Sequence, residues 1–242
     1  MKFSGFSSLL LILFITNILF AQNADTINKT DENGLKQGYW KKKDKAGSLI
    51  YTGHFTDNIP LGEFNYYYDD GRLRAKSEIS NSGQNAFTIT YHKNGRVMSE
   101  GFYKNQKKDS VWHFYDVYGQ KLTNETYSGG ILEGKFVTFY QSGDTTEILF
   151  YNNGLKEGSW KQYYKNGVLK TNGFFVNDTL NDTITYHFKN GAVQSAGKYF
   201  KGLMDGKWTH FNEEGLLERT EYYDKGRKTG QETLIEIHKE KK

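Results

Sequence analysis

Large apolar and polar residues alternate along most of this chain, and the alternation recurs with a period of 24 residues. Within each period, one alternating run is followed by a polar pair and a glycine, and a second run comes after the glycine. Alternation predicts β-strands, whereas helices show a period of 3.6 residues, which no stretch of the repeats sustains. Asn-Gly or Asp-Gly between two such runs indicates a tight hairpin turn, because both residues tolerate positive φ. Each period is therefore predicted to be one β-hairpin followed by a connecting turn.

Glycines establish the register of this repeat. A step of 24 residues from Gly38 reaches a glycine or another small residue in most copies, and each such residue begins a unit. Nine residues further on, the same step reaches glycine in all eight copies, and we predict a structural role in the hairpin turns for Gly47, Gly71, Gly95, Gly119, Gly143, Gly167, Gly191 and Gly215. Eight units without insertion or deletion then cover residues 38–229.

Large side chains occupy two further positions of the unit. The third residue is large in most copies, with Thr88 as the exception: Trp40, Phe64, Trp112, Phe136, Trp160, Ile184 and Trp208. The sixth residue is aromatic in six copies: Tyr67, Tyr91, Tyr115, Phe139, Tyr163 and Phe211. Residues three apart on a flat strand point to opposite faces, so we predict that the third-position row forms the core and the sixth-position row binds a partner. The alternative is that a twist or bulge buries both rows, or that rings simply cover both faces of a single-layer sheet.

An isolated hairpin cannot bury its own apolar face and is marginal in water. Stacked hairpins remove this problem, because each unit covers the face of its neighbour. The sequence therefore predicts an all-β fold, an elongated and twisted antiparallel sheet of eight tandem β-hairpin repeats of 24 residues each.

The two ends of the chain differ from the repeats. Residues 1–21 have the pattern of a signal peptide, with Lys2, an apolar run over residues 9–20, and Ala21 at a plausible cleavage point. We therefore expect an extracytoplasmic protein, located in the periplasm, at the cell surface or in the medium, with no transmembrane span after cleavage. Residues 22–37 are predicted to be a flexible lead-in. Residues 230–242 are predicted to form a capping strand, which begins at Thr233, and a charged tail.

Composition excludes several kinds of chemistry. The chain has no Cys, which rules out disulfides, zinc–thiolate sites and a cysteine nucleophile. Its six His residues lack metal-ligand spacing, and no phosphate-binding, nucleophile-elbow or dinucleotide-binding motif is present. The net charge of +4 is too small to indicate nucleic acid. We expect a protein that is not an enzyme, has no cofactor and no metal, and does not bind nucleic acid.

Several segments resemble the MORN repeat. The run from Tyr51 to Phe55, followed by Gly62-Glu-Phe64 and Asp70-Gly71, carries the resemblance, as does Gly197-Lys-Tyr199 with Gly206-Lys-Trp208 and Gly215. The unit length and the Asn-Gly turn are similar to the bacterial variant of this repeat, found in YwqK-type antitoxin-like proteins. The resemblance implies a stack of hairpins that serves as an interaction scaffold for proteins or lipid headgroups, or that neutralises a toxin. It implies no catalytic residue.

These observations favour an exported, non-enzymatic protein that binds another macromolecule. Exposed aromatic rings commonly form the energetic centre of protein interfaces, so we expect a protein partner or a scaffolding role at the cell envelope. Two alternatives stay open: a glycan- or cell-wall-binding module, since rings also stack on sugars, and an antitoxin-like or immunity inhibitor.

Overall fold

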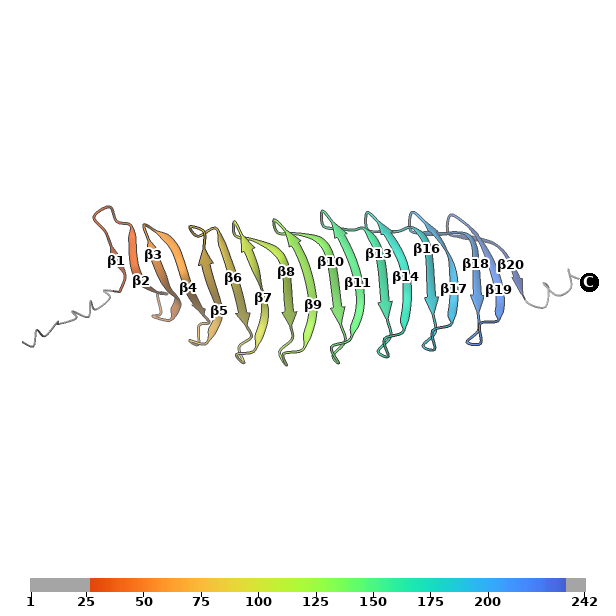
Figure 1. Ribbon diagram of the computed structural model, residues 1–242, viewed down its shortest axis with the longest axis horizontal. Coiled ribbons are helices and arrows are strands. Elements are labelled where there is room, and N and C mark those ends of the chain that lie inside the picture. Colours follow the sequence, from red (N-terminus) through yellow and green to blue (C-terminus); the bar gives the residue numbers. More distant parts are fainter. Residues whose placement is uncertain (1–26, 234–242) are drawn as a thin grey trace, which may run out of the picture.

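The computed structural model describes residues 27–233. The predicted signal peptide and almost all of the predicted tail lie outside the described residues. The described part contains no helix and forms one antiparallel sheet of 20 strands, with hairpins laid side by side in an elongated row (Figure 1). The predicted fold class is therefore confirmed.

Consecutive long strands are hydrogen-bonded neighbours throughout, and the three two-residue strands, β1, β12 and β15, are short extensions beside them. In chain order the strands are β1 (Lys29–Thr30), β2 (Lys36–Lys43), β3 (Leu49–Thr56), β4 (Ile59–Tyr67), β5 (Leu73–Ser80), β6 (Asn85–Tyr91), β7 (Val97–Lys104), β8 (Lys107–Tyr115), β9 (Lys121–Ser128), β10 (Ile131–Phe139), β11 (Thr145–Asn152), β12 (Leu155–Lys156), β13 (Gly158–Tyr163), β14 (Leu169–Val176), β15 (Thr179–Leu180), β16 (Asp182–His187), β17 (Val193–Phe200), β18 (Leu203–Phe211), β19 (Leu217–Asp224) and β20 (Arg227–Thr233).

Each hairpin turns at its predicted glycine. All eight of these glycines have positive φ, between +79° and +91°. In every turn the glycine N–H donates to the carbonyl three residues earlier, as Gly119 does to Asp116 at 3.0 Å. Glycine adopts this backbone conformation without the steric penalty that a side chain would add. These turns lie along one long edge of the sheet, and the connections between hairpins lie along the other (Figure 1).

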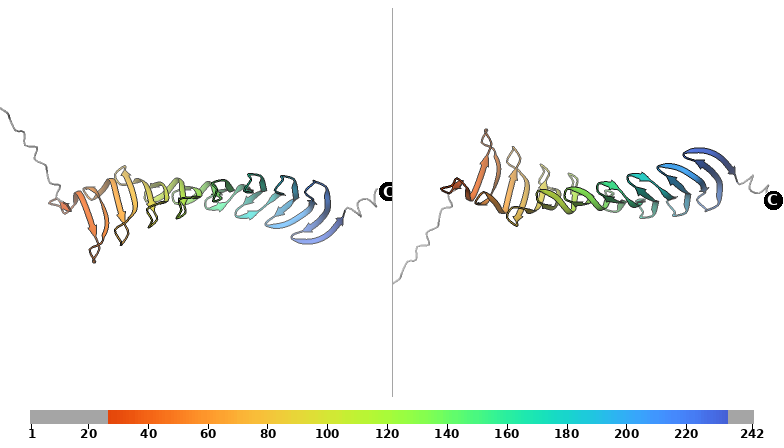
Figure 2. Two further views of the ribbon diagram at one scale, coloured as in Figure 1. Left: turned by 90° about the horizontal axis from the view of Figure 1, so that it is seen from below. Right: turned by 90° about the horizontal axis from the view of Figure 1, so that it is seen from above.

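A β-bulge interrupts every hairpin immediately before the sixth residue of the unit. In the fourth hairpin, Phe114 pairs with Thr123 but Tyr115 pairs with Lys121, so one residue of β9 is left over. The same shift occurs at the equivalent place in the other seven hairpins. A bulge increases the local twist of a strand pair, and the sheet twists visibly along its length (Figure 2).

The core lies on the face that carries the third-position row, which we call the ring face. Trp112, Ile184, Phe64 and Trp208 are each 1–2% exposed. The ring of Trp112 lies over the backbone of Gly101 in the preceding hairpin, and its Nε1 donates to the Phe102 carbonyl at 3.0 Å. Phe64 and Trp208 lie over Gly53 and Gly197 in the same way, so these hairpins cover their predecessors as the stacking argument predicts.

The structure corrects the predicted flexible lead-in. Residues 29–30 form β1, and β2 begins at Lys36, inside the segment expected to lack structure. The reason is a turn at Asp31, whose Oδ1 accepts hydrogen bonds from the backbone N–H groups of Asn33 and Leu35. At the other end, β20 begins at Arg227, before the predicted boundary at residue 230. Only Thr233 of the predicted last strand is among the described residues.

Candidate binding surfaces

The six rings predicted to bind a partner lie on the face opposite the ring face, which we call the back face. Tyr115 shows this placement, because its hydroxyl donates to Glu100 Oε1 at 2.8 Å. Glu100 lies between Ser99 and Gly101 in β7, and neighbouring side chains on a strand point to opposite faces. Burial, together with the bond to Glu100, raises the pKa of Tyr115 to about 12.

All six of these rings are half-buried, and none stands free of the sheet. The Tyr67 hydroxyl lies 3.4 Å from Thr52 Oγ1, which it helps to bury, and Lys121 Nζ lies 5.4 Å from the centre of the Phe139 ring. The structure thus includes the bulge and the two covered faces that the alternative interpretation described. Binding by this row stays a prediction, and much of its ring surface is used in covering the sheet.

The residue after four of these six rings forms a hydrogen-bonded ladder that the sequence interpretation missed: Tyr68, His92, Tyr140 and Tyr164. Tyr68 Oη donates to the Tyr91 carbonyl at 2.7 Å, and Tyr140 Oη donates to the Tyr163 carbonyl at the same distance. Tyr164 Oη repeats the contact with the His187 carbonyl. Each bond joins one hairpin to the next, close to the glycine turns. The sequence contained the relevant pattern, since an aromatic residue or His recurs at this place in several units.

Three exposed rings of the back face lie nearer the opposite edge of the sheet. Phe87, Phe150 and Phe174 are 43%, 39% and 41% exposed. Phe150 and Phe174 occupy equivalent positions in successive hairpins, so their backbones lie about 10 Å apart, two strand spacings. Alternation along the second strand of each unit could have identified these residues, but the sixth-position row carried the prediction instead.

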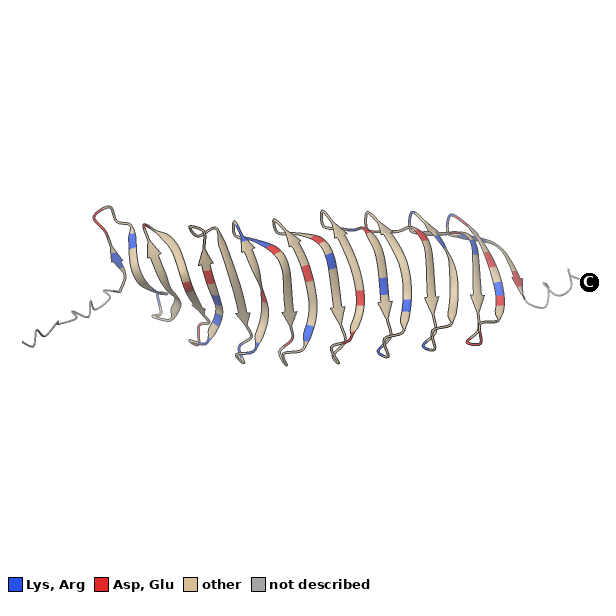
Figure 3. Ribbon diagram, viewed as in Figure 1, with Lys and Arg blue, Asp and Glu red and all other residues tan. Residues whose placement is uncertain are grey.

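Lysines surround the exposed pair Phe150 and Phe174. Lys135 is the direct cross-strand partner of Phe150, and Lys198 is the counterpart of Phe174 one hairpin further on. Lys161 and Lys207 lie on the same face, and all four lysines are exposed. We call Phe150, Phe174 and these four lysines the basic aromatic patch. Elsewhere Lys and Arg are interspersed with Asp and Glu along the sheet (Figure 3).

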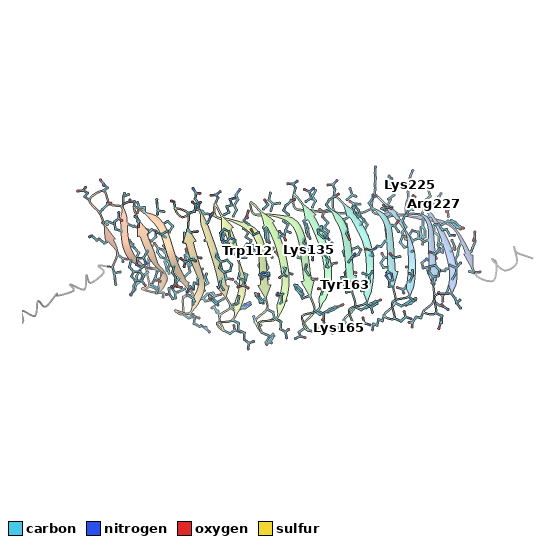
Figure 4. The ribbon with its side chains drawn as sticks, viewed as in Figure 1. Trp112, Lys135, Tyr163, Lys165, Lys225 and Arg227 are labelled. Atoms are coloured by element: carbon cyan, nitrogen blue, oxygen red, sulfur yellow. The ribbon has the colours of Figure 1, made fainter. Side chains whose placement is uncertain are left out.

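Cationic side chains also border both edges of the sheet. Lys165 lies at the edge of the glycine turns, whereas Lys225 and Arg227 lie at the edge of the connections between hairpins (Figure 4). Trp112 lies midway between these edges in the same view. These edges also carry exposed apolar side chains, such as Ile131, Leu155 and Leu216, whereas the phenylalanines of the patch lie within the face.

One buried carboxylate holds a charged cluster in the last complete hairpin. Glu221 accepts hydrogen bonds from Lys228 at 2.8 Å, Arg219 at 3.2 Å and Tyr223 at 3.0 Å, and His210 Nε2 lies 3.1 Å from it. The bond from Lys228 is the main reason that the pKa of Glu221 falls to about 2. Because each oxygen of this carboxylate is engaged by neighbouring side chains, the cluster is best explained as a structural tie between β18, β19 and β20.

The described residues offer no arrangement with evident catalytic or metal-binding geometry. Among residues 27–233, no three His, Cys, Asp or Glu side chains are grouped closely enough to hold a metal ion. In the same part of the chain, no helix has the length and apolarity needed to cross a membrane.

Comparisons with known proteins agree with the repeat architecture. The family model of the MORN repeat variant matches residues 88–105 and 156–177, each of which falls mainly within one hairpin. MORN repeats generally bind proteins or membranes and are typically non-catalytic. The more specific resemblance to YwqK-type antitoxins has no support from these matches. No curated protein matched the chain.

Three solved structures show only remote similarity. The "Crystal Structure of TarM" has 12% sequence identity to this chain and a TM-score of 0.24. The "Crystal Structure of TcdB2-TccC3-Cdc42" has 14% identity and a TM-score of 0.25. The "Crystal Structure of TcdB2-TccC3" has 13% identity and a TM-score of 0.24. The similarity covers 49%, 82% and 85% of this chain, but only 19%, 12% and 13% of those chains. This chain thus spans less than a fifth of each, and the likenesses indicate no function.

Proposed function

Because this chain carries repeats of the MORN variant, we propose that it is an exported, non-enzymatic scaffold that binds a protein partner at the cell envelope. The observation that carries the proposal is the basic aromatic patch on the back face. Exposed aromatic residues are enriched at the centres of protein interfaces, where they contribute much of the binding energy.

The charges of the patch favour a partner with an acidic surface around an apolar centre. Lys135, Lys161, Lys198 and Lys207 surround the two phenylalanines, and opposite charges steer association and select the partner. In the second hairpin the same face carries Glu63 and Glu78, and Glu63 pairs with Lys76 at 2.7 Å. The two halves of the back face therefore differ in charge, which would orient a partner along the sheet.

Export rests on the sequence of residues 1–21, whose charged start, apolar run and small residue at the cleavage point are typical of a signal peptide. Such a segment would deliver the repeats beyond the cytoplasmic membrane. Fractionation of cells that produce the full chain tests this part directly. Mature protein beginning at Gln22 in an extracytoplasmic fraction would support export, and full-length protein confined to the cytoplasm would refute it.

The binding surface is tested by quantitative capture from an envelope extract. The double variant Phe150→Ser/Phe174→Ser should lose a partner that the unaltered protein retains, because it removes both rings from the patch. Lys135→Glu/Lys198→Glu should weaken the same capture and reduce its dependence on salt. Leu216→Ser is the matched control, since this turn residue is 62% exposed and lies outside the patch.

The result is interpretable only if all variants fold, which circular dichroism melting will establish. Loss of one defined partner in both patch variants, with full retention by Leu216→Ser, would support the proposal. Equal capture by the unaltered protein and all variants would refute the assignment of this face.

A further inference from the structure

The junction between the second and third hairpins departs from the other junctions in its backbone. In seven of the eight units the first residue has positive φ, even where it is Ser110 or Asp182, but Ala86 does not. Correspondingly, β5 and β6 pair without any register shift from Ala75–Thr90 to Ser80–Asn85. The third unit therefore enters its first strand straight, without the local kink that its neighbours have.

The same junction lacks the large side chains that fill the ring face elsewhere. At the third position, where Trp112 lies in the next unit, the third unit has Thr88. Thr88 lies directly opposite Ser77, and their hydroxyl oxygens are 2.8 Å apart. Ala75 and Thr90 form the neighbouring cross-strand pair. Four small residues thus occupy adjacent places on β5 and β6, and at the place of Thr88 six of the other seven units have an aromatic ring.

This change leaves an open pocket of about 640 Å³ on the ring face. Tyr66 on β4 and Tyr103 on β7 line its two sides, and Ile79 closes one end. β4 and β7 are three strand spacings apart, about 14 Å, so a floor of two strands separates the tyrosines. Pockets of this volume are typical of sites for small molecules.

Polar groups surround the pocket: the Gln84 amide accepts a hydrogen bond from Asn81 at 3.1 Å, whereas the Arg74 and Gln106 side chains have no hydrogen bond among the described residues. Arg74, Gln84 and Gln106 line it and are exposed. Among the described residues, Arg74 has no hydrogen bond or ion pair of the kind that Arg72 forms with Asp70. Its positive charge does act on Tyr66, since it opposes the rise in the pKa of Tyr66 that burial causes. A cation is therefore available beside an aromatic wall.

We propose that this pocket binds a saccharide that carries a carboxylate. A sugar ring presents C–H groups, which pack against the negatively charged face of a tyrosine ring. The Ser77 and Thr88 hydroxyls already bond each other and the Thr90 hydroxyl bonds Ser99, but a hydroxyl can form more than one hydrogen bond. The hydroxyls of the sugar can therefore add to these bonds and bond the glutamine amides, which both donate and accept. A carboxylate would complete the pocket by pairing with Arg74, which recognises such groups with two parallel hydrogen bonds.

An aromatic side chain of a partner protein would also fit the space left by the missing ring, but it would offer no hydrogen bond to Arg74 or to the amide of Gln106. Burying polar groups without hydrogen bonds is costly. The lining therefore favours a saccharide over an apolar side chain.

The test begins with an array of oligosaccharides that includes neutral sugars and sugars containing uronic, sialic or muramic acid. The unaltered chain, produced from Gln22 onward, should bind carboxylate-bearing members selectively. For the strongest of these, calorimetry should show a loss of at least tenfold in affinity for Arg74→Gln. Thr88→Trp, which restores the ring that neighbouring units have, should abolish binding. Arg96→Gln is the matched control, because Arg96 bonds the Tyr118 carbonyl and does not line the pocket.

Several results would overturn the proposal: binding of no acidic saccharide, equal binding of neutral and acidic sugars, or unchanged affinity in both Arg74→Gln and Thr88→Trp. Since Arg74→Gln changes an exposed side chain, it keeps the test valid even if Thr88→Trp folds poorly. Phe150→Ser/Phe174→Ser should bind the saccharide normally, because those rings lie on the opposite face. Failure of the pocket can thus be distinguished from failure of the protein-binding patch.

Discussion

Gly101→Ala should destabilise the sheet strongly, although the substitution adds only one methyl group. The new Cβ would lie 2.4 Å from Cδ2 of Trp112, whereas ordinary contacts begin at about 3.4 Å. The indole would have to move by about 1 Å, away from its edge-on contact with Tyr103 at 4.8 Å and its hydrogen bond to the Phe102 carbonyl. Overpacking a core costs about 1–3 kcal/mol and a lost hydrogen bond about 1 kcal/mol, so we expect a loss of about 2–4 kcal/mol.

Gly173→Ala provides the matched control for this prediction. Its Cβ would approach Trp160 at 3.2 Å and Ile184 at 3.3 Å, contacts that small movements relieve. Urea unfolding followed by circular dichroism should therefore show a clearly smaller loss for Gly173→Ala. In a double-mutant cycle, Trp112→Leu should make Gly101→Ala nearly harmless, because the smaller side chain leaves room for the methyl group. Equal losses for the two alanine variants, or strict additivity in the cycle, would refute the reasoning.

Three further predictions concern the glycine turn at Gly167, the hydrogen bond of Tyr164 to the next hairpin and the charge of Glu221. Gly167→Val should lose about 1–2 kcal/mol through strain alone, because Gly167 has a φ of +79° and no atom crowds its missing Cβ; an unchanged thermal midpoint would contradict this. Tyr164→Phe removes the bond to the His187 carbonyl and should cost about 0.5–1.5 kcal/mol in urea unfolding, and a neutral result would show that the ladder does not stabilise the stack. The folded pKa of Glu221 is about 2, below its ordinary value of 4.5, so its contribution is present above about pH 5 and is lost as the pH falls toward 2. The stability advantage of the unaltered protein over Glu221→Gln, about 1–3 kcal/mol at pH 7, should therefore shrink across that window, and a constant difference would contradict the assignment.

The architecture could be predicted from the sequence because every unit forms the same hairpin from the same local pattern. Glycine at a fixed place, such as Gly119 or Gly167, encodes a turn whose backbone few other residues adopt, and the alternation on either side encodes the strands. Thr88 was visible as the exception in the third-position row. That exception marks the pocket, but its neighbours Ser77 and Ala75 become relevant only once the pairing of β5 with β6 is known.

The surface was harder to predict than the fold. Alternation assigns Tyr67 and Tyr115 to the back face, where the structure has them half-buried, but it does not locate the bulge beside them. The exposure of Phe150 and Phe174 depends on how far neighbouring side chains reach, which a single strand does not specify. The strand at Lys29 was missed since its formation depends on one side chain, Asp31, bonding the backbone of its own turn.

Small-angle X-ray scattering from the chain beginning at Gln22 tests the central claim most directly, that eight hairpins form one open sheet presenting its binding surfaces along its length. Two strands per unit at about 4.8 Å each give a sheet about 75–80 Å long, with a radius of gyration of about 22–26 Å. A compact domain of about 200 residues would have a radius of gyration of about 17 Å. We expect the larger value and a maximum dimension of at least about 75 Å. A value near 17 Å would contradict the extended sheet.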